Sequence, residues 1–194
     1  MKISMKSVIT ALAAILLSCT ASAQETQAGS ETDPVYLFNE VCYTQVPDVR
    51  KIQEMAKRFA WEPMGGEDLE RFTTIKTPDL LEGWDMRLAQ RIYRLGIVQS
   101  EPNDAFVKSY PELADALATS CTMVLDGQDD AQTILNRMNS MIGKGPTSLN
   151  VPEDELLTTT WSGGNDTVKV FVFLKADAIN RANLMNVTIV AASE

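Results

Sequence analysis

The chain has 194 residues and a formal net charge of −9, from 17 Lys and Arg against 26 Asp and Glu. An acidic chain without clustered Lys and Arg cannot neutralise many phosphates, so nucleic acid and anionic membrane surfaces are not expected partners. The chain contains no histidine, which excludes Ser-His-Asp and Cys-His nucleophiles and zinc or copper sites built on imidazole.

The first 23 residues have the organisation of a secretory signal peptide. Lys2 and Lys6 precede an apolar run from Val8 to Leu17, and Ala21-Ser22-Ala23 fits the small-residue pattern at which signal peptidase cleaves. The run of 10 residues is well short of the roughly 20 that a membrane-spanning helix needs. We therefore expect a cleaved leader, no membrane span, and a periplasmic or secreted protein.

Cys19 supports a second interpretation of the leader. The segment Leu16-Leu17-Ser18-Cys19 loosely resembles a bacterial lipobox, in which the cysteine is lipidated and becomes the first residue of the mature protein. A lipid anchor at Cys19 is therefore the alternative to free export.

The mature chain is predicted to form one domain. Removing residues 1–23 leaves 171 residues with a formal charge of −11, a length typical of a single domain with a sizeable core. Residues 24–34 are expected to be a disordered N-terminus, because 24–33 have no large apolar side chain. The folded domain is predicted over residues 35–192.

Two cysteines remain after cleavage, Cys42 and Cys121. An even pair in an oxidising compartment predicts one disulfide, with two buried free thiols as the alternative. The bond would close a loop of about 80 residues and restrict the unfolded state by roughly 4.5 kcal/mol on the chain-entropy model. The chain lacks Cys-x-x-Cys, which argues against a redox-active pair.

In the first half of the domain, apolar residues at three- and four-residue steps predict a helix from Pro47 to Ala60, which Pro63 ends. The segment Tyr36–Val41 before it fits a short helix or a strand. The following patterns predict a strand at 72–76, half-buried strands at 84–88 and 93–97 with a helix at 87–94 as the alternative, a turn at 102–104, and a short helix at 111–118.

The second half has clearer signals. A helix is predicted over about 130–142, with Asp129 or Asp130 as its N-cap and Gly143 as its stop. The strands predicted around this helix are 120–125 before it, and 156–161, 167–175 and 183–191 after it as an antiparallel meander. The expected fold is therefore a single α+β domain, with two main helices packed on antiparallel strands.

A weak internal similarity accompanies the cysteines, which lie 79 residues apart. Each is followed within six to eight residues by an Asp at a helix start, and each half continues into strands. Chance similarity is the favoured explanation, because only the pattern matches and not the residues. The alternative is a duplicated β-α-β-β unit whose two copies the disulfide would join.

Several short motifs carry a family resemblance over most of residues 35–192. They are Phe38-x-x-x-Cys42, Pro47-Asp48-Val49, an Ala-bearing helix and Trp61, then Cys121 with Gly127 and a capped helix. The chain thereby resembles small exported bacterial proteins of unassigned function that have one cysteine before each of two helices. Ala60 stands where these proteins usually have Gly. The resemblance implies export, an α+β domain and a disulfide, and it implies no catalytic residues.

Two acidic clusters are candidate sites: Glu67, Asp68 and Glu70, and Asp126, Asp129 and Asp130. The first would offer a carboxylate pair of the glycosidase kind, although acidic residues also favour a helix start. The second would offer calcium ligands, but its spacing is not that of an EF-hand, and turn formation with helix capping explains it.

Other polar segments are weaker candidates. Gly143–Ser148 fails the spacing of a phosphate-binding loop, and Ser140 with Lys144 lacks the Ser-x-x-Lys spacing of a catalytic dyad. The tryptophans fit core packing better than a stacking groove: Trp61, Trp84 and Trp161. We assign no catalytic, cofactor-binding or metal-ligating residue.

The sequence therefore favours a non-enzymatic binding or interaction module of the cell envelope, with an envelope component as its partner. A carboxylate-based envelope hydrolase is one alternative, and it requires two buried carboxyls in one cleft. An acidic inhibitor of a basic partner is the other, favoured only by the charge of the mature chain.

Overall fold

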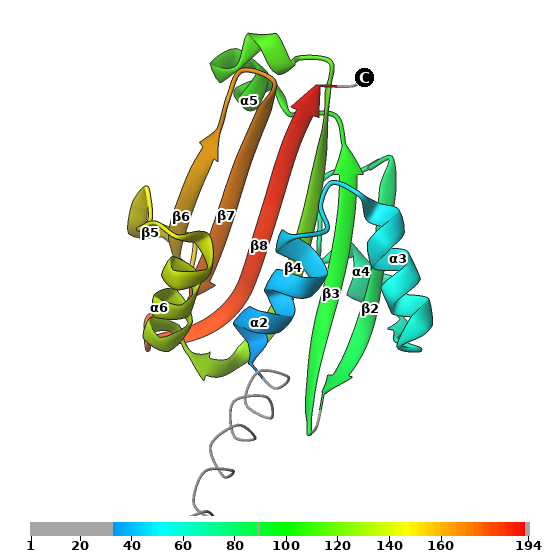
Figure 1. The fold of residues 1–194 in the computed structure, drawn as a ribbon, viewed down its shortest axis with the longest axis vertical. Coiled ribbons are helices and arrows are strands. Elements are labelled where there is room, and N and C mark those ends of the chain that lie inside the picture. The colour runs from blue at the N-terminus through cyan, green and yellow to red at the C-terminus, as the bar shows by residue number, and fades with distance from the viewer. Residues whose placement is uncertain (1–32, 89, 193–194) are drawn as a thin grey trace, which may run out of the picture.

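The structure is a computed structural model that describes residues 33–88 and 90–192. The predicted signal peptide, Cys19 and residues 24–32 of the expected disordered segment lie outside these residues. One antiparallel sheet dominates the fold (Figure 1), with the strand order β1-β2-β3-β4-β8-β7-β6-β5. Its strands are β1 (Glu62–Pro63), β2 (Leu80–Leu88), β3 (Arg91–Ser100), β4 (Ala116–Asp130), β5 (Ser148–Glu153), β6 (Leu156–Gly164), β7 (Val168–Ala176) and β8 (Arg181–Ala192).

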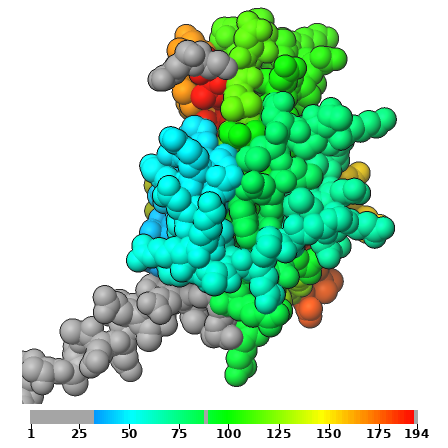
Figure 2. Space-filling model, turned by 90° about the vertical axis from the view of Figure 1, so that its right-hand side faces the viewer, coloured from blue at the N-terminus to red at the C-terminus, as the bar shows by residue number. Residues whose placement is uncertain are grey.

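Short helices lie around this sheet, and three of them share one face. They are α2 (Pro34–Phe38) with the π-helix η1 (Asn39–Tyr43), α3 (Val49–Arg58), α4 (Glu67–Glu70), α5 (Asp104–Ser109) with the 3-10 turn η2 (Pro111–Leu113), and α6 (Ala131–Ile142). In Figure 1, α2, α3 and α6 lie in front of the sheet and α4 lies behind it. The view turned by 90° shows the blue and cyan helical layer on one side of the green strands (Figure 2).

The strand register shows which side chains face this helical layer. One row of directly paired residues crosses six strands: Glu82, Ile97, Cys121, Val187, Val172 and Trp161. At one end of the row, Gln53 of α3 donates a hydrogen bond to Glu82 at 2.8 Å. At the other end, the buried Trp161 indole donates to Asn139 of α6 at 3.0 Å. The residues of this row therefore face the helices, and their immediate strand neighbours face the other way.

The disulfide connects the helical layer to the middle of the sheet. Cys42 in η1 and Cys121 in β4 are bonded, with their Cα atoms 5.5 Å apart, and both side chains are fully buried. They belong to the main apolar core between the helices and the sheet. The predicted disulfide is thus present, and it holds η1 against the central strand.

On the other face, two glycines form a depression that one aromatic ring fills. Gly83 of β2 lies directly opposite Gly96 of β3. A Cβ at Gly96 would overlap the ring of Phe72, and a Cβ at Gly83 would approach Met64 and Leu69. The segment 64–79 with α4 therefore covers the β2–β3 part of this face.

Helix α6 begins and ends where local chemistry predicts. Asp130 caps its N-terminus by accepting from the Thr133 amide at 2.8 Å and from the Thr133 hydroxyl at 2.7 Å. These bonds lower the pKa of Asp130, the hydroxyl contributing most. Gly143 closes the helix in the left-handed conformation at φ 76°, which a residue without a Cβ adopts at little cost.

The expected fold class was wrong. The domain is mainly β, a single eight-stranded antiparallel sheet with a few short helices, and not two main helices packed on strands. Part of the difference is local. Residues 111–118 were expected to be helical, but only Pro111–Leu113 turn, and β4 begins at Ala116 because that residue pairs with Ala192 of β8. The elements β1, β5 and α5 were not predicted, and residues 72–76, which were predicted to be a strand, do not form one.

The described residues also do not form the duplicated β-α-β-β unit that was the alternative to chance similarity. Cys42 lies in a helical turn and Cys121 lies within a strand, so the two cysteines are not equivalent. In each half a helix precedes four strands: α3 comes before β1–β4, and α6 comes before β5–β8. Both cysteines belong to the first half, so the disulfide does not join the two halves to each other.

Candidate functional site

Half of the sheet face opposite the helices has no covering element among the described residues. It extends over β4, β8, β7 and β6, and we call it the open face. Two rows of paired residues define it: Thr122, Asn186, Phe173 and Thr160, then Ser120, Thr188, Phe171 and Ser162. All eight side chains are partly exposed, whereas their strand neighbours on the helical side are mostly buried.

Two ridges border the open face. The segment 64–79 lies along its β3 side, where Phe72 covers Gly96. At one end, α5 and η2 bury Val190 beneath Leu113. The ring of Phe106 in α5 also meets Phe171 edge to face, with centroids 6.1 Å apart. The segment 64–79 and the α5–η2 segment therefore mark two borders of the open face.

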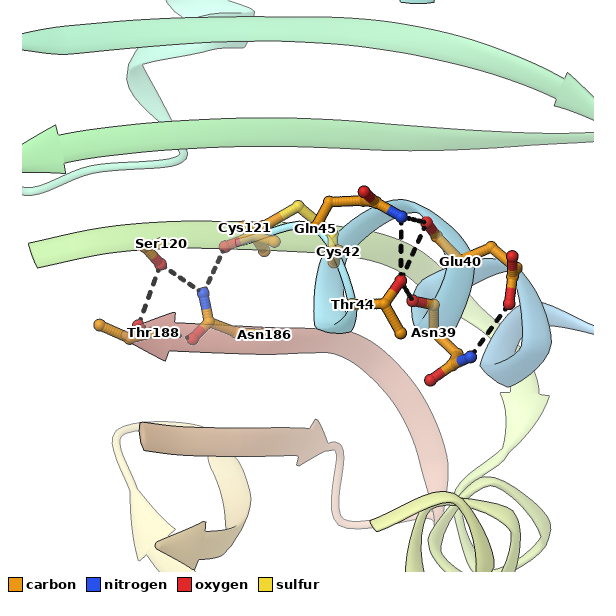
Figure 3. The surroundings of a disulfide bond; sticks show 10 residues. Asn39, Glu40, Cys42, Thr44, Gln45, Ser120, Cys121, Asn186 and Thr188 are labelled. Carbon is orange, nitrogen blue, oxygen red and sulfur yellow. Dashed lines mark hydrogen bonds between the residues drawn. A yellow bond between two sulfur atoms is a disulfide. The ribbon is translucent and has the colours of Figure 1, made fainter. Parts of the chain in front are cut away.

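A hydrogen-bonded network occupies its centre (Figure 3). The Asn186 amide donates to the hydroxyls of Ser120 and Thr122, each at 2.7 Å. Thr188 donates its single proton to the Asn186 carbonyl at 3.0 Å or to Ser120 at 3.1 Å. The four side chains come from β4 and β8, so the pairing of these two strands positions the network.

The network leaves hydrogen-bonding capacity for a ligand. It uses both amide protons of Asn186 and the one proton of Thr188. Ser120 and Thr122 act only as acceptors within it, so each keeps a hydroxyl proton to donate outward. The site therefore presents two hydroxyl oxygens whose positions the network sets before anything binds, each with a proton left to donate.

Aromatic rings lie directly beside these polar groups. Phe171 and Phe173 on β7 have ring centroids 6.4 Å apart and planes inclined by only 13°. On β8, Thr188 pairs with Phe171 and Asn186 pairs with Phe173, while Ser162 and Thr160 occupy the same rows on β6. Polar groups therefore flank the aromatic strip on both sides.

Three cations beside the strands of the open face have partners. Lys175 pairs with Glu153 at 3.0 Å, and Arg94 pairs with Asp126 at 2.6 Å. Lys169 lies over the ring of Tyr110, 4.8 Å from its centroid. The hydroxyl of Thr158, and after it Lys175, lower the pKa of Glu153, which keeps this carboxylate charged and paired. The eight side chains of the two rows that define the open face carry no charge.

No protein-family model matches the chain, and neither a curated protein nor a solved structure matches it. Within residues 33–88 and 90–192, no helix is long and apolar enough to cross a membrane. The disulfide is compatible with an extracytoplasmic protein.

The predicted acidic clusters have structural roles. Asp126 pairs with Arg94, Asp129 pairs with Arg91 at 2.6 Å, and Asp130 caps α6. Their segment is a bulge in β4, where the register with β8 shifts between Val124 and Asp129. In the part of the chain that the structure describes, no group of three or more acidic or thiol side chains could hold a metal ion.

The first acidic cluster lies in α4, which contains no buried residue. Asp68 forms an exposed ion pair with Arg71 at 3.4 Å. No Asp or Glu is buried anywhere in the described ranges, so they lack the two buried carboxyls that a carboxylate hydrolase requires. This cluster is a helix start, as the alternative explanation predicted.

The remaining candidates also have structural explanations. Lys144 donates to the Ser162 carbonyl at 2.7 Å, while Ser140 donates to the Asn136 carbonyl at 3.1 Å, so these two side chains do not form a dyad. Trp84 and Trp161 are buried in the core, as predicted. Trp61 is only partly buried and packs against the core from its border.

One polar cluster was not predicted. The hydroxyl of Tyr93 and one carboxylate oxygen of Asp129 are buried without a hydrogen-bond partner. Tyr93 first, and then Asp129, raise the pKa of the neighbouring Arg91 guanidinium. Within this cluster, Arg91 pairs with the other carboxylate oxygen of Asp129 at 2.6 Å.

The sequence of β4 contains one signal of the open face. Ser120 and Thr122 alternate with the buried Cys121 and Met123 in β4, which places hydroxyls on one face of that strand. Alternation alone does not show which face a helix covers.

Proposed function

We propose that this protein is a non-enzymatic binding module of the periplasm or the secreted space, and that the open face is its binding surface. The observation that supports this most is the organised network of Ser120, Thr122, Asn186 and Thr188 on an uncovered part of the sheet. On a sheet face that only contacts solvent, water can satisfy each polar side chain, so a network of four side chains beside two phenyl rings is not required for folding.

The underlying framework is suited to recognition. Cys121 lies between Ser120 and Thr122 in β4 and points to the opposite side, where the disulfide attaches it to η1. The strand that carries both outward hydroxyls is therefore held by a covalent bond from behind. Preorganised groups bind with a smaller loss of conformational entropy.

The sheet edges are poor alternatives for binding. The strand β1 has two residues, one of which is Pro63. The strand β5 contains Pro152, and its pairing with β6 is interrupted near Asn150, which has φ 50°. Short strands, prolines and bulges all disfavour the addition of a partner strand. Recognition is therefore more favourable on the face than at an edge.

An affinity experiment tests the proposed surface. Mature protein is immobilised and exposed to cell-envelope extract, in parallel with F173E on the open face and F59E on α3. Phe59 is the matched control because it is 56% exposed and lies beyond the end of a helix on the other side of the sheet. Circular dichroism and melting temperature establish that both variants are folded.

We expect the wild type and F59E to retain the same component and F173E to lose it. A component retained by F173E and lost by F59E would contradict the proposed surface. Turnover of a substrate in the extract by the wild type would contradict the non-enzymatic role. Salt-sensitive capture of a basic protein, independent of Phe173, would favour the inhibitor alternative instead.

A further inference from the structure

The side chains of the open face are of the types that bind carbohydrates: aromatic rings next to neutral hydrogen-bonding groups. We infer that it binds an uncharged glycan chain, an inference that rests on the proposed function and names its ligand class. Sugars present apolar C–H faces and a rim of hydroxyls. A complementary protein surface therefore needs aromatic rings to pack against the C–H faces. It also needs fixed hydrogen-bond donors and acceptors to meet the hydroxyls.

The charge distribution favours a neutral ligand. The chain carries a net charge of −9, so an anionic polymer would be repelled at long range. The carboxylates of Glu153 and Asp126 beside these strands are already paired with Lys175 and Arg94, so they offer little attraction to a cationic ligand. Binding at the centre of the face therefore depends on hydrogen bonds and apolar contact and not on ion pairing.

The order of side chains across the face matches a sugar lying flat. In one row, Phe173 lies between Thr160 and Asn186, with Thr122 beyond. A pyranose ring placed over Phe173 would have its hydroxyl rim above polar groups on both sides. Thr122 donates outward on the β4 side, since its oxygen already accepts from Asn186.

The second row repeats this order and indicates a chain rather than a single sugar. Phe171 lies between Ser162 and Thr188, and Ser120 takes the place of Thr122. The two phenyl rings follow each other along β7 at 6.4 Å with nearly parallel planes. Two consecutive rings of an extended oligosaccharide would meet equivalent surroundings. The contact of Phe171 with Phe106 marks one end of the path.

The test uses defined oligosaccharides and the full mature protein. Cellohexaose, maltohexaose and chitohexaose are the neutral probes, a hyaluronan hexasaccharide is the anionic probe, and a lysine hexapeptide is the cationic probe. Affinity is measured by calorimetry for the wild type, F173A, N186A and F59A. Backbone amide shifts of labelled protein locate the bound probe.

We expect at least one neutral hexasaccharide to bind and to shift amides of β4, β7 and β8. Its affinity should fall about tenfold or more in F173A, from loss of the ring contact, and by less than about twofold in F59A. Raising salt from about 50 to about 500 mM should change the affinity by less than about twofold. N186A should weaken binding while keeping the wild-type fold by circular dichroism, since Asn186 orients both hydroxyl donors.

Two outcomes overturn the inference and separate it from the proposed function. If no neutral probe shifts the open face, the carbohydrate assignment is wrong, and the extract experiment alone judges the binding surface. If only a charged probe binds, with loss in F173A, the assignment of an uncharged glycan is wrong and the surface is supported. If a neutral probe binds equally to wild type, F173A and N186A, both are wrong.

Discussion

Breaking the disulfide is expected to cost a large part of the stability of this domain. The bond joins residues 79 apart in sequence, and both sulfurs lie in the core. Loop-closure entropy for about 80 residues corresponds to roughly 4.5 kcal/mol at 25 °C. Natural domains have total unfolding free energies of about 5–15 kcal/mol, so this one bond supplies a substantial share.

The corresponding fall in melting temperature follows from the size of the domain. Unfolding entropy is about 2.1 cal/mol/K per residue, which gives about 0.33 kcal/mol/K for roughly 160 ordered residues. The C42A/C121A variant should therefore melt about 13 °C below the oxidised wild type. Differential scanning calorimetry and urea unfolding monitored by circular dichroism measure the two quantities independently.

The single variants distinguish loop closure from lost packing. C42A and C121A each open the same loop, so each should lose nearly as much stability as the double variant. Losses of less than about 4 °C for each single variant, adding up in the double variant, would refute the loop-closure reasoning. Wild type refolded under reducing conditions is the control, and it should match the double variant apart from the effect of the two sulfur atoms.

Two further predictions follow from the fold. G96A should destabilise the domain by about 1–3 kcal/mol because the new methyl displaces the Phe72 ring. The same substitution should have little effect in an F72A background. Chemical unfolding of the wild type, G96A, F72A and G96A/F72A measures both effects. A full penalty in both backgrounds would contradict this account. The lowered pKa of Asp130 stabilises the fold fully above about pH 4 and progressively less as the pH falls through the folded-state value. Relative to D130N, which retains the cap without titrating, the wild type should therefore lose stability below about pH 4 in unfolding titrations, and a pH-independent difference would contradict the assigned cause.

Local signals predicted some elements accurately. The helix α6 was predicted with both of its ends, because Asp130 and Gly143 act on their own neighbours in sequence. The strands β6, β7 and β8 were predicted from the alternation of apolar side chains and the β-branched composition. These features depend on contacts within a few residues, so a single sequence carries them.

Elements decided by distant partners were not predicted. The segment 72–76 has the composition of a strand, but Phe72 is drawn into the depression over Gly96, and no strand forms there. The alanines around Ala116 favour a helix in isolation, yet pairing with β8 makes them part of β4. In both cases a contact made across a long stretch of chain outweighs a small local preference.

The candidate site shows the same division. Hydroxyls on alternate residues of β4 are visible in the sequence, as is the Phe-x-Phe of β7. Their meeting in one surface requires β8 to lie between these strands and bring Asn186 to both hydroxyls. The alternation of polar and apolar residues within each strand does not determine the order of the strands in the sheet, because many strand orders are compatible with the same alternation.

From the residues alone, one disulfide was predicted, because only two cysteines follow the predicted leader. Imidazole chemistry was excluded, because the chain has no histidine. The tertiary structure alone decided the order of the strands, the face that the helices cover and the half of the other face that stays open. The physical reason is that cysteine pairing and helix capping involve few alternatives. Sheet order is instead a competition among many long-range pairings, and their energies depend on every other strand being in place.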